Sequence, residues 1–233
     1  MAITYTEEQR ELVKLVRDVA RNEVMPYVAA ADKAGECPRE LYQWGFDLGL
    51  HMVEIPEQFG GMGLSYETCA MMFEELAWVD AAYADAFVTN FVAFRNILLN
   101  GTEEQARHFV EKTENNGFAA FCLTEANAGS DVAAMRTTAV LDGDKYVLNG
   151  TKTFITNGSI SDIYVVFARP IRKPAPTASR ASSSTATPRV LLPAPRSTRW
   201  ASACRTPPRS FSRTCACREA PSSGKSDAAC PSR

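Results

Sequence analysis

The chain changes its composition abruptly after Arg169. The 64 residues from Pro170 onward hold 12 of the 25 Lys and Arg residues and ten of the 13 prolines, but only two acids, Glu219 and Asp227. Residues 1–169 carry 25 acidic and 13 basic side chains. A segment so rich in Pro, Ser, Ala and Arg buries too little apolar surface to offset its conformational entropy. Residues 170–233 are therefore expected to be disordered, and only the acidic first part is expected to fold.

Several classes of protein are disfavoured by the same first part. The N-terminal sequence MAITYTEEQRELV lacks the basic start and apolar run of an export signal, and no window is apolar enough for a membrane span. Only Cys37, Cys69 and Cys122 precede the basic segment, which suits reduced thiols better than a disulfide framework. The two histidines, His51 and His108, are too few for a His-based metal site. We expect a cytoplasmic protein that has no membrane-spanning segment and no metal site.

Helical patterns run through residues 1–116. Thr6-Glu7-Glu8-Gln9 and Thr102-Glu103-Glu104-Gln105 are capping boxes, in which a hydroxyl and a Gln side chain satisfy opposite ends of a first helical turn. Apolar side chains at helical spacing predict three further helices, through residues 39–50, 66–80 and 82–100. This part of the chain is predicted to be an all-α domain.

Two features of the helical part could suggest a binding site but fit packing better. Met71, Met72, Phe73 and Leu76 resemble a sulfur-rich binding face, yet their helical spacing alone is typical of core residues. The GGMG run at residues 60–63 resembles a phosphate loop, but no Lys-Ser/Thr follows it and no strand clearly precedes it. We interpret the first set as core and the second as a turn.

The sequence period changes at Gly117. Short β-rich runs follow at residues 118–125, 139–150, 151–158 and 162–168, separated by turn dipeptides such as Asp142-Gly143 and Asn157-Gly158. The predicted fold is α+β, an N-terminal helical domain (1–116) followed by an incomplete, largely antiparallel β domain (117–169) and the disordered segment (170–233).

One stretch of the β part could approach a ligand closely. In FCLTEANAGSD, residues 121–131, a strand opens into a loop of small residues that carries Thr124, Ser130 and several free backbone N–H groups. Such a loop can donate hydrogen bonds to a flat ring or a phosphate without side-chain bulk. The same stretch also fits an ordinary β-turn with two surface hydroxyls, so it does not identify a site by itself.

Four segments taken together resemble the acyl-CoA dehydrogenase family. EIPEQFGGMGLS, GTEEQ, FCLTEANAGSD and LNGTKTFITNG occur in the order and spacing of that family, and the resemblance covers residues 1–169. It implies a flavoprotein that holds FAD without a GxGxxG fold. The residues that would contact FAD by this resemblance are Phe121, Cys122, Leu123, Thr124, Gly129, Ser130, Phe154, Ile155 and Thr156.

The resemblance also assigns roles within that set. Thr124 would lie near the pyrimidine end of the flavin, and Ser130 would reach toward the pyrophosphate or the acyl-CoA substrate. Phe154, Ile155 and Thr156 would pack beside the isoalloxazine, with Thr156 bonding near N5. Each of these positions is an expectation carried over from the family pattern.

The chemistry that the resemblance implies is the oxidation of an acyl-CoA to its trans-2-enoyl-CoA, with an electron-transferring flavoprotein as acceptor and a homotetramer as the intact assembly. A carboxylate removes the α-proton, and the family holds it in a C-terminal four-helix domain that this sequence is expected to lack. Glu125 belongs to the flavin-side loop instead. No catalytic residue is therefore assigned, and a silent FAD- or acyl-CoA-binding fragment, or a non-functional product, is the alternative.

The basic segment from residue 170 has the composition of a GC-rich gene translated out of frame. When the codons of residues 184–191 are regrouped by one base they can spell DTPGF, and those of residues 198–203 can spell KMGIR. Both resemble the family's next β segments, in the right order, which favours a frameshift; a genuine basic linker is the other interpretation. Nucleic-acid binding by this basic segment is disfavoured, because the bases of a nucleic acid would stack on aromatic side chains and the segment has only Trp200 and Phe211.

Overall fold

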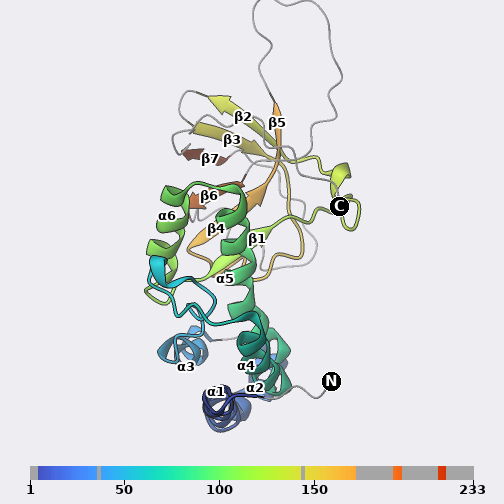
Figure 1. Cartoon of the computed structure of the whole chain (residues 1–233). Helices are drawn as coiled ribbons and strands as arrows, with labels where there is room; N and C mark the ends of the chain where they lie inside the picture. The colour runs from blue at the N-terminus through green and yellow to red at the C-terminus, as the bar shows by residue number, and fades with distance from the viewer. Residues whose placement is uncertain (1–4, 36–37, 143–144, 172–190, 196–214, 219–233) are drawn as a thin grey trace, which may run out of the picture.

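The computed structural model describes residues 5–35, 38–142, 145–171, 191–195 and 215–218, with helices first and strands after them (Figure 1). In these residues the α-helices are α1 (Glu7–Val19), α2 (Met25–Ala34), α3 (Gln43–Asp47), α4 (Tyr66–Val79), α5 (Ala81–Asn100) and α6 (Glu103–Thr113). A π-helical turn, Ala20–Val24, joins α1 to α2. Short 3-10 turns lie at Arg39–Tyr42, Glu57–Phe59 and Val132–Ala134.

Both predicted capping boxes are confirmed. At the start of α1 the Thr6 hydroxyl accepts from the Gln9 N–H at 3.2 Å, and the Gln9 side chain accepts from the Thr6 N–H at 3.0 Å. Thr102 and Gln105 make the same reciprocal pair at 3.2 and 2.9 Å before α6. These bonds satisfy N–H groups that the first turn of a helix leaves without partners, so each box fixes where its helix begins.

The helix boundaries differ from prediction in two places. Residues 39–50, predicted as one helix, form a 3-10 turn followed by the short α3 and then turns. α2 was not predicted, because its sequence has no apolar stripe. In keeping with this, none of its side chains is fully buried. Pro26 stands in its first turn, directly after the π-helical turn, where the regular hydrogen-bond ladder is already interrupted and a residue without an N–H is accommodated.

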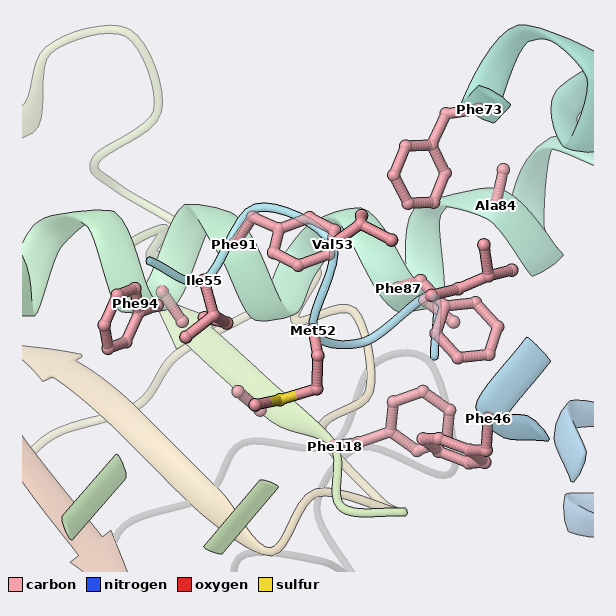
Figure 2. Close-up of a cluster of buried hydrophobic side chains, with 14 of the residues drawn as sticks. Phe46, Met52, Val53, Ile55, Phe73, Ala84, Phe87, Phe91, Phe94 and Phe118 are labelled. Carbon is pink, nitrogen blue, oxygen red and sulfur yellow. The ribbon is translucent and has the colours of Figure 1, made fainter. Parts of the chain in front are cut away.

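α5 is the central helix of the core, with α4, α6 and β1 (Ala119–Cys122) packed around it. Figure 2 shows Phe87, Phe91 and Phe94 along this helix, with Phe46 and Phe118 reaching Phe87 from other segments. The Phe87 ring centroid lies 5.3 Å from that of Phe46 and 5.5 Å from that of Phe118. The helical part and the first strand therefore share one aromatic core.

The methionine-rich face of α4 belongs to this core, as predicted. Met72, Phe73 and Leu76 are buried, and Met71 is half-buried. The GGMG run is a turn, also as predicted: Gly60 and Gly63 have φ angles of 86° and 59°, which favour glycine.

Two sheets form the β part. β1 pairs in parallel with β4 (Ile163–Phe167), which pairs with β6 (Leu191–Pro195) in antiparallel fashion. The second sheet has the order β5 (Arg169–Ile171), β2 (Thr138–Asp142), β3 (Lys145–Asn149) and β7 (Cys215–Arg218). Three of the five described pairings are antiparallel, and β1–β4 and β2–β5 are parallel. The predicted order of helices followed by a largely antiparallel β region is confirmed.

Residues 151–158 are not the β-rich run that the sequence predicted. They form a loop in which Phe154 and Asn157 have positive φ angles of 56° and 60°. A left-handed backbone breaks the alternation of a strand, and Asn tolerates it better than most residues. The side chain of Asn157 also donates to two backbone carbonyls, which holds the loop in this conformation.

Residues 170 and 171 form the end of β5, and two further short parts of the segment predicted to be disordered are strands, namely β6 and β7. They pair with β4 and β3, whose free edges would otherwise leave backbone N–H and C=O groups without partners. Residues 172–190, 196–214 and 219–233, on which the rest of that prediction falls, lie outside the described residues, as do Cys37 and the second residue of the Asp142-Gly143 turn.

Candidate functional site

The fold brings together the two segments that were predicted to contact a flavin. The first is the end of β1 with the loop to Ser130, and the second is the loop 151–158. The Thr153 N–H donates to the Thr124 carbonyl oxygen at 3.0 Å, which joins the two segments directly. Phe121, Leu123 and Thr124 are half-buried at the end of the strand.

Cys122 differs from its neighbours because its side chain lies in the protein interior. It is fully buried in a small apolar cluster with Leu148, Tyr164 and Val166. Only its backbone can therefore face a ligand. Gly129 and Ser130 are exposed at the far end of the loop, and a Cβ added to Gly129 would meet open space.

Phe154 is the most unusual of the predicted residues. Its side chain is 91% exposed, in a backbone conformation that a bulky residue seldom adopts. Ile155 beside it packs on the apolar cluster of Cys122, and Thr156 is half-buried. A large ring held outward by a strained backbone is a surface on which a planar group can stack, and such strain is common at ligand sites. The Thr124, Ser130 and Thr156 hydroxyls belong to the same two segments, so the residues present fit FAD.

A buried ion pair lies directly behind these loops, and the sequence analysis missed it. The Lys152 ammonium donates to Glu125 Oε1 and to the Leu123 carbonyl, both at 2.9 Å. The two side chains are only 1% and 4% exposed. The pair ties the loop that carries Thr124 to the loop that carries Phe154. Its one signal in the sequence is a lone lysine in the otherwise uncharged run TKTFITNG.

Glu125 has further partners that keep it ionised. Its carboxylate accepts from the N–H groups of Arg136 at 2.7 Å and Thr137 at 2.9 Å. Burial raises the pKa of Glu125, but hydrogen bonds from Thr137, Arg136 and Lys152 outweigh it and hold that pKa below its usual value. Burial lowers the pKa of Lys152, against the opposing effect of Glu125. A carboxylate so fully engaged is not available as a base for a substrate.

α5 is joined to the start of β1 and to the loop 151–158 by side-chain hydrogen bonds. The Asn90 amide, fully buried, donates to the Gly117 carbonyl at 3.1 Å and accepts from the Ala119 N–H at 2.7 Å. The Asn157 amide donates to the Ala86 carbonyl at 2.7 Å and to the Ala119 carbonyl at 3.2 Å. The position of the loop 151–158 against β1 is therefore set by side-chain hydrogen bonds to this helix and strand.

The described residues offer little for other kinds of site. The side chains of Cys69 and Cys122 are buried, and burial raises the pKa of Cys69 to about 12. Within the same described ranges, no group of three or more His, Cys, Asp or Glu side chains could hold a metal ion. None of the helices among those residues is long and apolar enough to cross a bilayer.

Comparison with known proteins identifies the fold family. Residues 6–116 match the acyl-CoA dehydrogenase N-terminal domain, and residues 120–192 match the acyl-CoA dehydrogenase middle domain. The chain belongs to the acyl-CoA dehydrogenase family. The middle-domain match continues beyond Arg169, where the sequence analysis placed the end of the resemblance.

The matched part of this chain covers less than half of each of the following relatives. It is similar to an acyl-CoA dehydrogenase of Bacillus subtilis (strain 168), with 38% identity over 70% of this chain and 44% of the relative. Butyryl-CoA dehydrogenase from Megasphaera elsdenii matches in structure with a TM-score of 0.66 and 35% identity, over 72% of this chain and 46% of that one. A glutaryl-CoA dehydrogenase from Mycobacterium smegmatis in complex with FADH2 matches with a TM-score of 0.66 and 27% identity, over 71% of this chain and 43% of that chain. This family member therefore spans less than half the length of these proteins.

Proposed function

We propose that this chain supplies the helical domain and the flavin-binding face of an FAD-dependent acyl-CoA dehydrogenase, which oxidises an acyl-CoA to its trans-2-enoyl-CoA. The observation that carries the proposal is the contact between the two loops. The Thr153 N–H bonds to the Thr124 carbonyl, so the two segments that the family pattern assigns to the flavin meet in the folded chain. The family matches over both domains and the FADH2 complex of a similar protein support the same cofactor.

The chain's own residues would bind and orient FAD. Phe154 offers an exposed ring for stacking beside the isoalloxazine. Thr156 would bond near N5, Thr124 near the pyrimidine end, and Ser130 toward the pyrophosphate or acyl-CoA. When bound, FAD supplies the acceptor for a hydride from the substrate's β-carbon. The ion pair of Lys152 and Glu125 would hold both loops in position beside the flavin.

The other half of the reaction needs a carboxylate to take the α-proton. Glu125 is unsuitable, because its oxygens accept from Lys152 and from backbone N–H groups and its side chain is 4% exposed. We propose that this base belongs to a part of the whole enzyme outside the matched domains. An electron-transferring flavoprotein as acceptor, a homotetramer and a cytoplasmic location are likewise proposals for the whole protein.

A binding function without turnover is the second candidate. It is favoured by the length comparison, since this chain spans 44% of the Bacillus subtilis relative. In that case the 233-residue chain would bind FAD and not oxidise acyl-CoA. A flavin titration and a dye-reduction assay on the same sample distinguish the two candidates.

The test is FAD binding by the purified 233-residue chain. Titration should quench flavin fluorescence, and Phe154→Ala should weaken binding about two- to tenfold, because stacking of aromatic rings contributes roughly 0.5–1.5 kcal/mol. Leu99→Ala, which removes another exposed apolar side chain (74%) at the end of α5, is the matched control. A chain that binds no FAD, or that loses affinity equally in both variants, contradicts the proposal.

A further inference from the structure

Thr156, the residue expected beside flavin N5, already has a hydrogen-bond partner within the chain. Its hydroxyl donates to Asp85 Oδ2 at 2.9 Å. Asp85 lies in the second turn of α5 and is exposed, while Thr156 is half-buried. The neighbouring residues fix this contact, because the Asn157 amide donates to the Ala86 carbonyl at 2.7 Å.

The direction of this hydrogen bond follows from the chemistry of the two groups. An ionised carboxylate has no proton and can only accept, and a hydroxyl has one proton to give. A hydrogen bond to a carboxylate is about twice as strong as a neutral one. The proton of Thr156 is therefore committed to Asp85, and its oxygen keeps lone pairs with which it can accept a second hydrogen bond.

This direction matters for a flavin, because the two oxidation states differ at N5. Oxidised flavin has a lone pair at N5 and needs a donor there. Flavin reduced by two electrons has an N–H at N5 and needs an acceptor. A threonine whose proton is held by a carboxylate suits the second state and not the first.

We propose that Asp85 is a positioning residue, which makes Thr156 a hydrogen-bond acceptor toward N5 and so favours binding of reduced over oxidised FAD. The inference rests on the proposed function, since it needs FAD with N5 near Thr156. Asp85 acts through Thr156 and need not touch the flavin. It was not singled out from the sequence, because it is 71 residues from Thr156.

The test compares dissociation constants of the full 233-residue chain for FAD and for dithionite-reduced FAD under anaerobic conditions. In Asp85→Ala the Thr156 proton is free to turn to oxidised N5. The ratio of the two constants should shift about two- to tenfold toward oxidised FAD, the range that one hydrogen bond spans. For a two-electron couple a tenfold shift lowers the potential of the bound flavin by about 30 mV.

A double-mutant cycle separates this mechanism from a direct effect of the Asp85 charge. In Thr156→Val the hydroxyl is absent, so adding Asp85→Ala should leave the ratio unchanged. Glu74→Ala, at an exposed acid on α4, is the control for a general change in charge. Far-UV circular dichroism and the melting temperature check that each variant folds.

Each result has one meaning. A redox-state ratio that shifts in Asp85→Ala but not in the Thr156→Val background supports the inference. An unchanged ratio in Asp85→Ala overturns it, and so does an equal shift in both backgrounds. If the parent chain binds FAD in neither state, the proposed function fails and the inference fails with it.

Discussion

Replacing Lys152 with methionine should strongly destabilise the fold. The change keeps an unbranched side chain of similar length but removes the ammonium that pairs with Glu125. Removing one partner of a buried ion pair costs about 3–5 kcal/mol of stability, because the other charge stays buried without a partner. Glu125 would retain the N–H groups of Arg136 and Thr137, so we expect the lower end of that range, about 3 kcal/mol.

The measurement is thermal and urea unfolding of the parent and variant chains. For a chain of this size, 1 kcal/mol changes the melting temperature by roughly 2–4 °C, so Lys152→Met should lower it by about 6–12 °C. Lys112→Met is the matched control: its ammonium lies 3.8 Å from the Glu111 carboxylate at the surface, and it should cost less than about 0.5 kcal/mol.

A second variant separates loss of the pair from loss of packing. Glu125→Gln combined with Lys152→Met removes both charges, while the Gln oxygen still accepts from backbone N–H groups. It should recover at least half of the stability lost in the single variant, because no unpaired charge is left. If Lys152→Met loses no more stability than Lys112→Met, the ion pair is not desolvated in the way that its burial implies.

The same ion pair predicts that the protein loses stability at acid pH. The native pKa of Glu125 lies below its unfolded value, so its contribution is complete above about pH 4.3, the unfolded value, and is lost as the pH falls through the native pKa. Lys152 is one of the groups that lower this pKa, so in Lys152→Met the native pKa should lie closer to the unfolded value and the acid loss of stability due to Glu125 should be smaller. A pH series of melting temperatures for the parent and the variant measures the difference.

The remaining predictions concern the scaffold. Asn90→Ala removes two buried hydrogen bonds and leaves their backbone partners unsatisfied, and urea unfolding should show a loss of about 2–4 kcal/mol. Gly61→Ala would drive a Cβ into the Ile55 carbonyl oxygen, so its melting temperature should fall well below that of Gly35→Ala, where the Cβ meets open space and only the positive φ opposes it. Burial lowers the pKa of His51. The parent should therefore lose stability as the pH falls below about 6.5, where the unfolded chain gains the proton first, and His51→Gln should lose less.

Local signals made the helical part predictable. A capping box needs only four consecutive residues, and the buried stripe of α4 repeats within one helix, so both were identified without tertiary information. α2 was missed because it buries no side chain fully. The loop 151–158 was predicted as β-rich from its Thr, Phe and Ile, but contacts of Asn157 with α5 and β1 impose a different backbone.

The site was only partly predictable for the same reason. A family pattern marks residues that face a ligand, but it does not mark the partners that hold them. Lys152 lies 27 residues from Glu125, and Thr156 lies 71 residues from Asp85. Such pairs become visible only when the chain is folded, because neither residue has a local signature. Cys122 illustrates the converse, since its place in the motif gave no sign that its side chain points into an apolar cluster.

The two attachments on α5 also limit how this chain can change in length. Ala86 holds Asn157 through its carbonyl, and Asn90 holds Gly117 and Ala119 through its amide. These two helix positions are four residues apart and so face the same side, and each inserted residue would turn one of them by about 100° relative to the other. A single-residue insertion or deletion between them would detach either the loop or the strand. We therefore expect natural length variation to avoid this stretch of α5 and to occur in the surface connections.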